Sequence, residues 1–243
     1  MAVGTAVRNP YSALPNCLYP TFVFVTLGLF AVYGLWVVFF NREGFSAPYL
    51  SPFYSPLIHV GPIPPGVWVA WAPLAFRLTC YYYRKAYFRS FFWHPRSCAV
   101  EEPKRRRYRG ETAFPWVLNN LHRFAFYATV VQVGFLWYDT ILAFDFQGRF
   151  GIGLGSVIML VNVLLLTGYT FGCHAFRHLA GGNLDCFSCS ASARARYQLW
   201  KGVSVLNVRH DRWAWASLFS VAGTDIYIRL LMAGVLMDPR WIA

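Results

Sequence analysis

Charged residues are scarce in this sequence, and acidic residues are the scarcest. Only 13% of the 243 residues are charged, whereas soluble domains carry about 25%. The chain has 10 acidic residues against 22 Lys and Arg, which is too few for the carboxylate chains that relay protons through pumps. This shortage excludes an ordinary soluble domain, and several uninterrupted apolar runs predict a polytopic membrane protein.

Three further features are missing. Residues 1–20, before the first apolar run, contain one Arg and no short apolar segment with a small-residue cleavage site, so we expect no cleavable signal peptide. The sequence has no internal repeat, which argues against a transporter. It also has no segment composed like a soluble domain, and the whole chain, 1–243, is treated as one membrane-anchor domain.

The apolar runs predict an all-α bundle of five transmembrane helices. About 20 apolar residues cross a hydrocarbon core roughly 30 Å thick. The expected helices cover about 21–40, 67–92, 114–146, 152–178 and 200–237, with basic loops at 93–113 and 179–199. The Pro-rich segment 46–65 is expected outside the hydrocarbon, because lipid-exposed irregular backbone is not tolerated there.

The formal charge of +12 has a distribution that argues against nucleic acid as a partner. Lys and Arg gather beside the apolar runs, in residues 84–109 and 177–212, as the positive-inside rule expects for cytoplasmic segments. This places the N-terminus in the cytoplasm and the C-terminus outside. The basic loops are expected to meet lipid headgroups, or to dock a partner subunit.

Thiols and imidazoles recur at the cytoplasmic ends of the predicted helices. At a rise of about 1.5 Å per residue, seven of them lie at a similar depth: Cys80, Cys98, His122, Cys173, His174, His178 and His210. His174 and His178 are four residues apart and share a helix face. This belt predicts a metal or haem site.

The residues alone leave the kind of centre open. Two Cys and two His are the ligand set of a Rieske-type [2Fe–2S] centre and also suit zinc, although the usual paired Cys-x-His loops are absent. Two facing imidazoles would hold one haem b, whereas two haems are not expected, because only His59 lies near the opposite face. Cys186-x-x-Cys189 is half of a zinc motif without its second half and is interpreted as loop. Most of the cysteines fall on the predicted cytoplasmic side, where disulfides are rare, so metal binding or plain burial is expected of them instead.

Polar side chains near the belt predict a quinone site. An apolar slot with hydrogen-bond donors and a proton route would be supplied by Tyr82, Tyr83, Arg84, Arg123 and Asp211. Deeper residues, Asp139 and Asp225 with Tyr138 and Tyr227, are expected to form a second site or a proton path to the outer face. Asp225 has an alternative partner in Arg229, four residues further on the same helix.

A series of motifs occurs in a characteristic order. The longest is Phe76-Arg-Leu-Thr-Cys80-Tyr-Tyr-Tyr-Arg84-Lys85-Ala-Tyr87-Phe-Arg89-Ser-Phe. It is followed by Gly110-Glu-Thr-x-Phe-Pro, Asn120-x-His122-Arg123, Cys173-His174-x-x-Arg177-His178-x-x-Gly-Gly, Leu206-Asn-x-Arg209-His210 and Thr224-Asp225-x-Tyr227. From about residue 50 onward, the chain thereby resembles the membrane anchor of the actinobacterial-type succinate dehydrogenase.

The resemblance implies a subunit of succinate:menaquinone oxidoreductase, or complex II, in the bacterial plasma membrane. In that complex a flavoprotein oxidises succinate, and an iron–sulfur subunit passes electrons to the anchor, which reduces menaquinone. Assembly as a trimer of heterotrimers is left open. The rival class is a non-redox protein, either a transporter or a scaffold that docks a soluble partner by its basic loops.

The resemblance also implies a Rieske-like cluster in the anchor rather than haem b. The expected ligands are Cys80 and Cys173 with two of His122, His174, His178 and His210, and Cys98 is the reserve thiol. Relatives carry a further Cys two positions after the His of the fourth helix. That position is Phe176 here, so this thiol is not expected to be an essential ligand.

Overall fold

The computed structural model describes residues 18–41, 44–91, 116–182 and 184–242. The predicted reserve ligand Cys98 and the whole of the predicted loop 93–113 lie outside these residues. The helices are α1 (Leu18–Leu35, continued by the π-helical turn Trp36–Phe40), α2 (Pro65–Thr79), α3 (Tyr81–Phe91), α4 (His122–Leu142), α5 (Leu154–Phe171), α6 (His174–Gly181), α7 (Ala191–Asn207) and α8 (His210–Met232).

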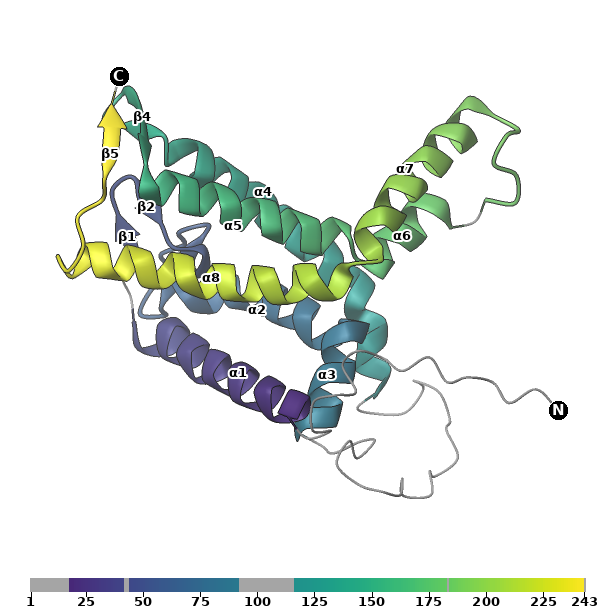
Figure 1. Ribbon diagram of the computed structural model, residues 1–243, viewed down its shortest axis with the longest axis horizontal. Coiled ribbons are helices and arrows are strands. Elements are labelled where there is room, and N and C mark those ends of the chain that lie inside the picture. The colour runs from purple at the N-terminus through teal and green to yellow at the C-terminus, as the bar shows by residue number, and fades with distance from the viewer. Residues whose placement is uncertain (1–17, 42–43, 92–115, 183, 243) are drawn as a thin grey trace.

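Five long helices, α1, α2, α4, α5 and α8, run side by side as a bundle (Figure 1). Helix α5 packs against α8 and α4, and α2 packs against α4, while α1 contacts α3. Large apolar side chains remain exposed on the outside of the bundle, for example Val32, Val131 and Ile141 at 68%, 62% and 67%. Exposed apolar surface on this scale fits a protein that is surrounded by lipid.

Three of the described helical segments have the length and composition needed to cross a membrane: Leu18–Phe40, His122–Leu142 and Leu154–Phe171. Helix α2 has 15 residues and contains Pro73, and α8 carries Asp and Arg in its sequence. The chain is therefore an all-helical membrane subunit, whereas the five-span count and the orientation of the termini stay predictions.

Three predicted continuous helices are broken in the structure. The expected helix 67–92 divides at Cys80, which has extended backbone (φ −62°, ψ 128°). The expected helix 152–178 divides at Gly172–Cys173, where Cys173 is extended and its Sγ accepts from Ala175 N, 3.4 Å away, to cap α6. The expected helix 200–237 divides at Val208–Arg209, and its first part belongs to α7, which begins at Ala191.

These breaks have a common physical basis. At each of them backbone N–H groups turn back to carbonyls three residues earlier, as in Cys80 N to Arg77 O (3.3 Å) and Cys173 N to Thr170 O (3.3 Å), and such tight turns close the ends of helices. Asn207 Nδ2 also donates to the freed carbonyl of Gly172 at 2.9 Å. The predicted helix 114–146 is likewise shorter, since a 3₁₀ turn, Trp116–Leu121, precedes α4.

The two ends of the bundle differ in architecture (Figure 1). At one end, called the sheet end, lie the hairpin β1–β2 (Phe45–Ser46, Tyr49–Leu50), the 3₁₀ turn Pro52–Tyr54, and an antiparallel sheet of β3 (Asp145–Phe146), β4 (Arg149–Gly153) and β5 (Arg240–Ile242). At the other end, called the thiol end, lie α3, both helix-break cysteines, and the α6–α7 hairpin, which projects from the bundle.

Candidate functional site

Two thiol–imidazole pairs lie at the thiol end. Cys80 Sγ is 3.5 Å from His210 Nε2, and Cys173 Sγ is 3.0 Å from His122 Nε2. The four residues come from four places in the chain: the α2–α3 break, the first residue of α4, the α5–α6 break and the first residue of α8. The predicted belt therefore contains a real convergence of two thiols and two imidazoles.

The helix breaks position these side chains. Both cysteines sit where the backbone leaves the helix, and both histidines are the first residue of one. The side chains of a continuous helix spread around its axis, about 100° per residue, whereas a break allows the next side chain to turn inward. Breaks in α2–α3 and α5–α6 thus bring thiols from two separate segments into one core cluster.

The thiols are almost completely buried. Cys80 is 2% and Cys173 is 1% exposed, and they pack in one apolar cluster with Phe76, Tyr83 and Tyr169. This burial raises the pKa of the Cys173 thiol to about 12. The Cys173 thiol is therefore protonated at neutral pH, and a metal that binds it must displace that proton.

Aromatic rings hold both imidazoles in place. Phe76 stacks on His122 with ring centroids 4.7 Å apart and an interplanar angle of 5°. Tyr169 stacks on His210 at 5.0 Å and 15°, and Phe76 meets Tyr169 edge-on at 5.3 Å. The two histidines are thus joined through two aromatic rings in contact.

The Nδ1 atoms of the two histidines differ in their hydrogen bonding. His122 Nδ1 lies 2.8 Å from Thr79 Oγ1, which directs Nε2 toward Cys173, as a second partner does for metal-binding imidazoles. His210 Nδ1 is buried and has no hydrogen-bond partner among the described residues. A buried nitrogen without a hydrogen-bond partner is energetically costly, and His210 Nδ1 is such an atom at the thiol end.

In the described part of the chain, no three His, Cys, Asp or Glu side chains are gathered so that they would hold one ion. Two thiols and two imidazoles are the donor set both of a Rieske cluster and of a zinc site. The two S···N distances identify which side chains are neighbours, but they do not assign any side chain to a particular iron atom.

The other two predicted histidine ligands lie further out. His174 begins α6 and is exposed, although it is near enough to interact electrostatically with His122 and His210. His178 is also exposed, one turn further along α6. Geometry therefore favours His122 and His210 within the predicted set.

The predicted quinone residues near this end are only partly brought together. Tyr83 is buried, accepts from Arg77 and donates to Ala214 O at 2.7 Å. Tyr82 accepts from Trp215 Nε1 at 2.7 Å. Arg84 lies over the ring of its neighbour Tyr81, whereas Arg123 and Asp211 are exposed.

The deeper predicted residues are separate at the sheet end. Asp225 is 0% exposed and accepts from Tyr33, Ser51 and Arg229, whose Nε is 2.7 Å away. Tyr227 donates to Asp238 at 2.6 Å instead. The alternative pairing of Asp225 with Arg229 is present in the structure.

Asp139 and Tyr138 do not take part in the hydrogen bonds that Asp225 and Asp238 accept. The buried Oδ2 of Asp139 has no partner among the described residues, and Tyr138 is 60% exposed. A cleft of about 450 Å³ opens near the same end, between α4, α5 and the β3–β4 turn, and is lined by Trp137, Ile141, Phe144, Arg149 and Phe150 among others. The role predicted for Asp139 and Tyr138 stays a prediction.

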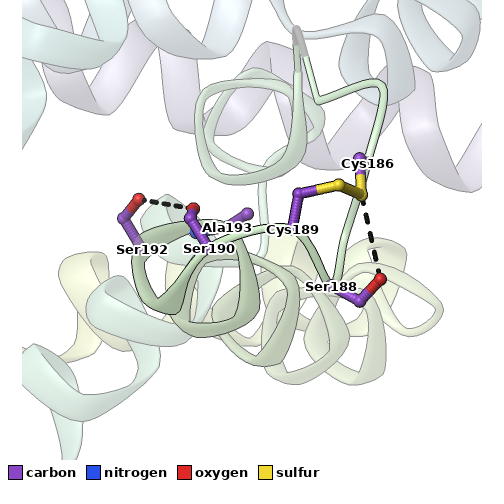
Figure 2. Close-up of a disulfide and its surroundings, with 6 residues drawn as sticks. All are labelled: Cys186, Ser188, Cys189, Ser190, Ser192 and Ala193. Carbon is purple, nitrogen blue, oxygen red and sulfur yellow. Dashed lines mark hydrogen bonds between the residues drawn. A yellow bond between two sulfur atoms is a disulfide. The ribbon is translucent and has the colours of Figure 1, made fainter.

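The Cys186-x-x-Cys189 motif forms a disulfide in the α6–α7 connection (Figure 2). The disulfide differs from the sequence prediction, which places this segment on the cytoplasmic side, where disulfides are rare. Cys186 Sγ lies 3.8 Å from Ser188 Oγ, and Ser190 caps α7 by accepting from Ala193 N at 3.0 Å. The motif is consequently a local staple at the tip of the hairpin and is separate from the thiol–imidazole pairs.

Sequence reasoning missed the residues that support the site. Thr79, Phe76 and Tyr169 orient the imidazoles, yet a Thr or an aromatic in an apolar run has no distinguishing pattern. Arg77 could have been identified from the sequence, because a cation inside an apolar run is energetically costly unless it has a partner.

Comparisons with known proteins agree with the motifs. The family model described as actinobacterial succinate dehydrogenase subunit SdhC matches residues 18–234. Among solved structures, a chain of the Mycobacterium smegmatis Sdh1 complex in the apo form is similar, with a TM-score of 0.84 and 37% identity over 100% of this chain and 97% of that chain. No curated protein sequence matches significantly.

The match covers nearly all of the chain, including every helix that contributes to the thiol–imidazole pairs. It sets aside the rival classes of transporter and unrelated scaffold. The chain belongs to the family of the actinobacterial succinate dehydrogenase subunit SdhC, and it is a membrane anchor subunit of that enzyme.

Proposed function

We propose that this anchor receives electrons from an iron–sulfur subunit and passes them to menaquinone through a Rieske-type [2Fe–2S] cluster at the thiol end. The observation that carries the proposal is the convergence of two buried thiols and two imidazoles, with S···N distances of 3.0 and 3.5 Å. Family membership supplies the context, since succinate oxidation delivers electrons that a membrane anchor must take up.

The proposed ligands are Cys80, Cys173, His122 and His210. Both thiols are buried, and both imidazoles are fixed by aromatic stacking with Nε2 directed at a sulfur. His174 and His178 are exposed and are outer alternatives. When bound, the cluster would supply one-electron transfer, while the protein excludes water and fixes the orientation of the ligands.

A single haem b is the weaker alternative. A haem with two axial histidines needs two imidazole nitrogens that face each other across the macrocycle. Here each Nε2 faces a cysteine sulfur, and an aromatic side chain stacks on each imidazole ring. These contacts favour a sulfur-containing centre.

The iron–sulfur and flavoprotein subunits are proposed to dock at the thiol end, on the cytoplasmic side of a five-span bundle. The α6–α7 hairpin projects there (Figure 1), and it is held rigid because Arg196 donates to the carbonyls of Ala180 and Gly182 at 3.1 and 2.7 Å. Exposed cations near this end include Arg194, Lys201, Arg209 and Arg212. Their positive charge suits an acidic partner surface and the positive-inside rule.

Menaquinone is proposed to bind next to the centre, near α3. Tyr82 and Tyr83 contribute aromatic surface and hydroxyls, and Trp215 supplies an indole N–H that already meets Tyr82. Ring faces and a few polar groups are what a quinone head requires. Arg84, Arg123 and Asp211 stay candidates for charge stabilisation and proton delivery, and Asp139, Asp225 and Tyr227 stay candidates for a second site or proton path.

The direct test uses the purified succinate dehydrogenase complex that contains this chain. We expect bound iron beyond that of the partner subunits, a Rieske-like EPR signal in the reduced complex, and loss of both in Cys173→Ser and His210→Ala. The matched control is His178→Ala, an exposed histidine at the same end, which should retain the signal. Unchanged iron in C173S and H210A, with the complex assembled, would reject the ligand assignment.

A further inference from the structure

Arg77 places a positive charge beside the thiol–imidazole pairs. It lies in the last turn of α2, three residues before Cys80. Its guanidinium carbon is 4.7 Å from the centre of the Tyr169 ring, and the same ring stacks on His210 at 5.0 Å. One tyrosine therefore separates the cation from a proposed ligand.

The guanidinium is held by neutral groups only. Arg77 Nη2 donates to Ser217 Oγ at 3.0 Å, and Nη1 donates to Ala214 O at 3.3 Å and to the hydroxyl of Tyr83. Tyr83 in turn donates to Ala214 O at 2.7 Å. These contacts fix the position of Arg77 and satisfy its hydrogen bonds, but none of them cancels its charge.

No carboxylate pairs with Arg77 in the part of the chain that the structure describes. The other arginine inside the bundle, Arg229, has such a partner, because its Nε is 2.7 Å from Asp225. A cation within a membrane protein is costly unless it is paired or faces a functional site. Stacking on Tyr169 recovers part of that cost, and a negative charge nearby would recover more.

The proposed centre would provide that charge when it is reduced. With two thiolate and two neutral imidazole ligands, an oxidised [2Fe–2S] cluster carries no net charge, and the addition of one electron makes it singly negative. Net charge and neighbouring charges are among the factors that set cluster potentials. A fixed cation beside the cluster therefore favours the reduced form.

We propose that Arg77 is a positioning residue that raises the reduction potential of the centre, so that it accepts electrons more readily from the iron–sulfur subunit. This inference rests on the proposed function. Coulomb's law with an effective dielectric constant of about 20 gives an effect of about tenfold on the reduction equilibrium for unit charges roughly 10 Å apart. For a one-electron couple, tenfold corresponds to about 59 mV.

The experiment is an EPR-monitored redox titration of the whole purified complex, with iron content measured on the same samples. Arg77→Met removes the charge and keeps an apolar side chain of similar length, and Arg77→Lys keeps the charge but loses the planar fork of donors. Lys85→Gln is the matched control, because it removes an exposed cation five residues from Cys80. The partner subunits' own clusters serve as internal references.

We expect the equilibrium constant for reduction of the centre to fall about tenfold in R77M, much less in R77K, and negligibly in K85Q. An R77M centre with full iron and an unchanged potential would overturn the proposal. If R77M does not retain the centre, Arg77→Gln replaces it and must show the same fall. Loss of iron in R77K as well as in R77M and R77Q would make Arg77 a purely structural support and would also overturn it.

This experiment distinguishes a failure of the proposed centre from a failure of the role proposed for Arg77. A wild-type complex without a centre in this chain would remove the proposed function itself. A wild-type centre whose potential does not respond to R77M would remove only the role of Arg77.

Discussion

The two ends of the bundle differ in how their buried charged groups are paired, although the buried Oδ2 of Asp139, near the sheet end, also has no partner among the described residues. At the sheet end, Asp225 accepts from Arg229, Tyr33 and Ser51, and Asp238 accepts from Tyr49, Tyr227 and Gly155. At the thiol end, Arg77 has no carboxylate among the described residues and His210 Nδ1 has no partner there.

This difference in charge pairing suggests that the polar groups at the sheet end stabilise the fold and that those at the thiol end serve the candidate site. Buried polar networks that are completely satisfied stabilise one arrangement of a fold, whereas unsatisfied groups at particular places commonly mark a site for chemistry. The sheet end therefore behaves as a clamp that joins the hairpin β1–β2, α8 and the C-terminal segment. In the proposed function, the donor atoms and the charge at the thiol end serve a metal centre.

The largest effect is expected from breaking the clamp. Arg229→Met leaves the fully buried Asp225 without its cation, and an uncompensated buried carboxylate destabilises a protein by about 3–5 kcal/mol. We expect R229M to lower the thermal stability of the complex strongly, as measured by unfolding in detergent. The double variant Arg229→Met/Asp225→Leu should recover much of the loss, and failure to recover it would indicate that the ion pair is not the source of stability.

A smaller effect, confined to the thiol end, is expected from Thr79→Val. The substitution removes the hydroxyl 2.8 Å from His122 Nδ1 and conserves the side-chain shape. Loss of such an outer partner usually weakens metal binding about 10- to 100-fold, so T79V should release iron to a chelator faster than the wild type does, with thermal stability little changed. The comparison variant is Thr167→Val on α5, whose hydroxyl contacts Trp137, and equal chelator sensitivity in both would contradict a ligand role for His122.

The smallest effect is a pH dependence at the sheet end. Burial, and then the hydrogen bond to Asp238, raise the pKa of Tyr49 to about 12 from its ordinary value of 10.0. The neutral phenol is favoured in the folded state, so its contribution is complete below pH 10 and is lost as the pH rises from 10 toward 12. We expect Tyr49→Phe to flatten the alkaline loss of thermal stability in that window, and identical slopes for variant and wild type would show that another group dominates.

The convergence at the thiol end was largely predictable from the sequence. Positive-inside charge and a fixed rise per residue put Cys80, His122, Cys173 and His210 at one depth, because depth along a helix depends on local sequence alone. That His122 and His210, rather than His174 and His178, lie beside the thiols was not predictable, since it depends on which faces the neighbouring helices cover.

The helix breaks could not be predicted either. The run from Val67 to Tyr83 is apolar and aromatic apart from Arg77 and Thr79, and there is no Gly or Pro next to Cys80, so nothing local marks the interruption. The break is stabilised by tertiary contacts, among them the hydrogen bond of Thr79 with His122. The short strands β1, β2 and β3, of two residues each, are too short to show an alternating pattern.

The most direct test of the central claim is a high-resolution cryo-EM map of the complete purified complex. The account predicts compact metal density at the thiol end, in contact with Cys80, His122, Cys173 and His210. A planar haem at this position, or side-chain density for these four residues with nothing bound between them, would contradict it.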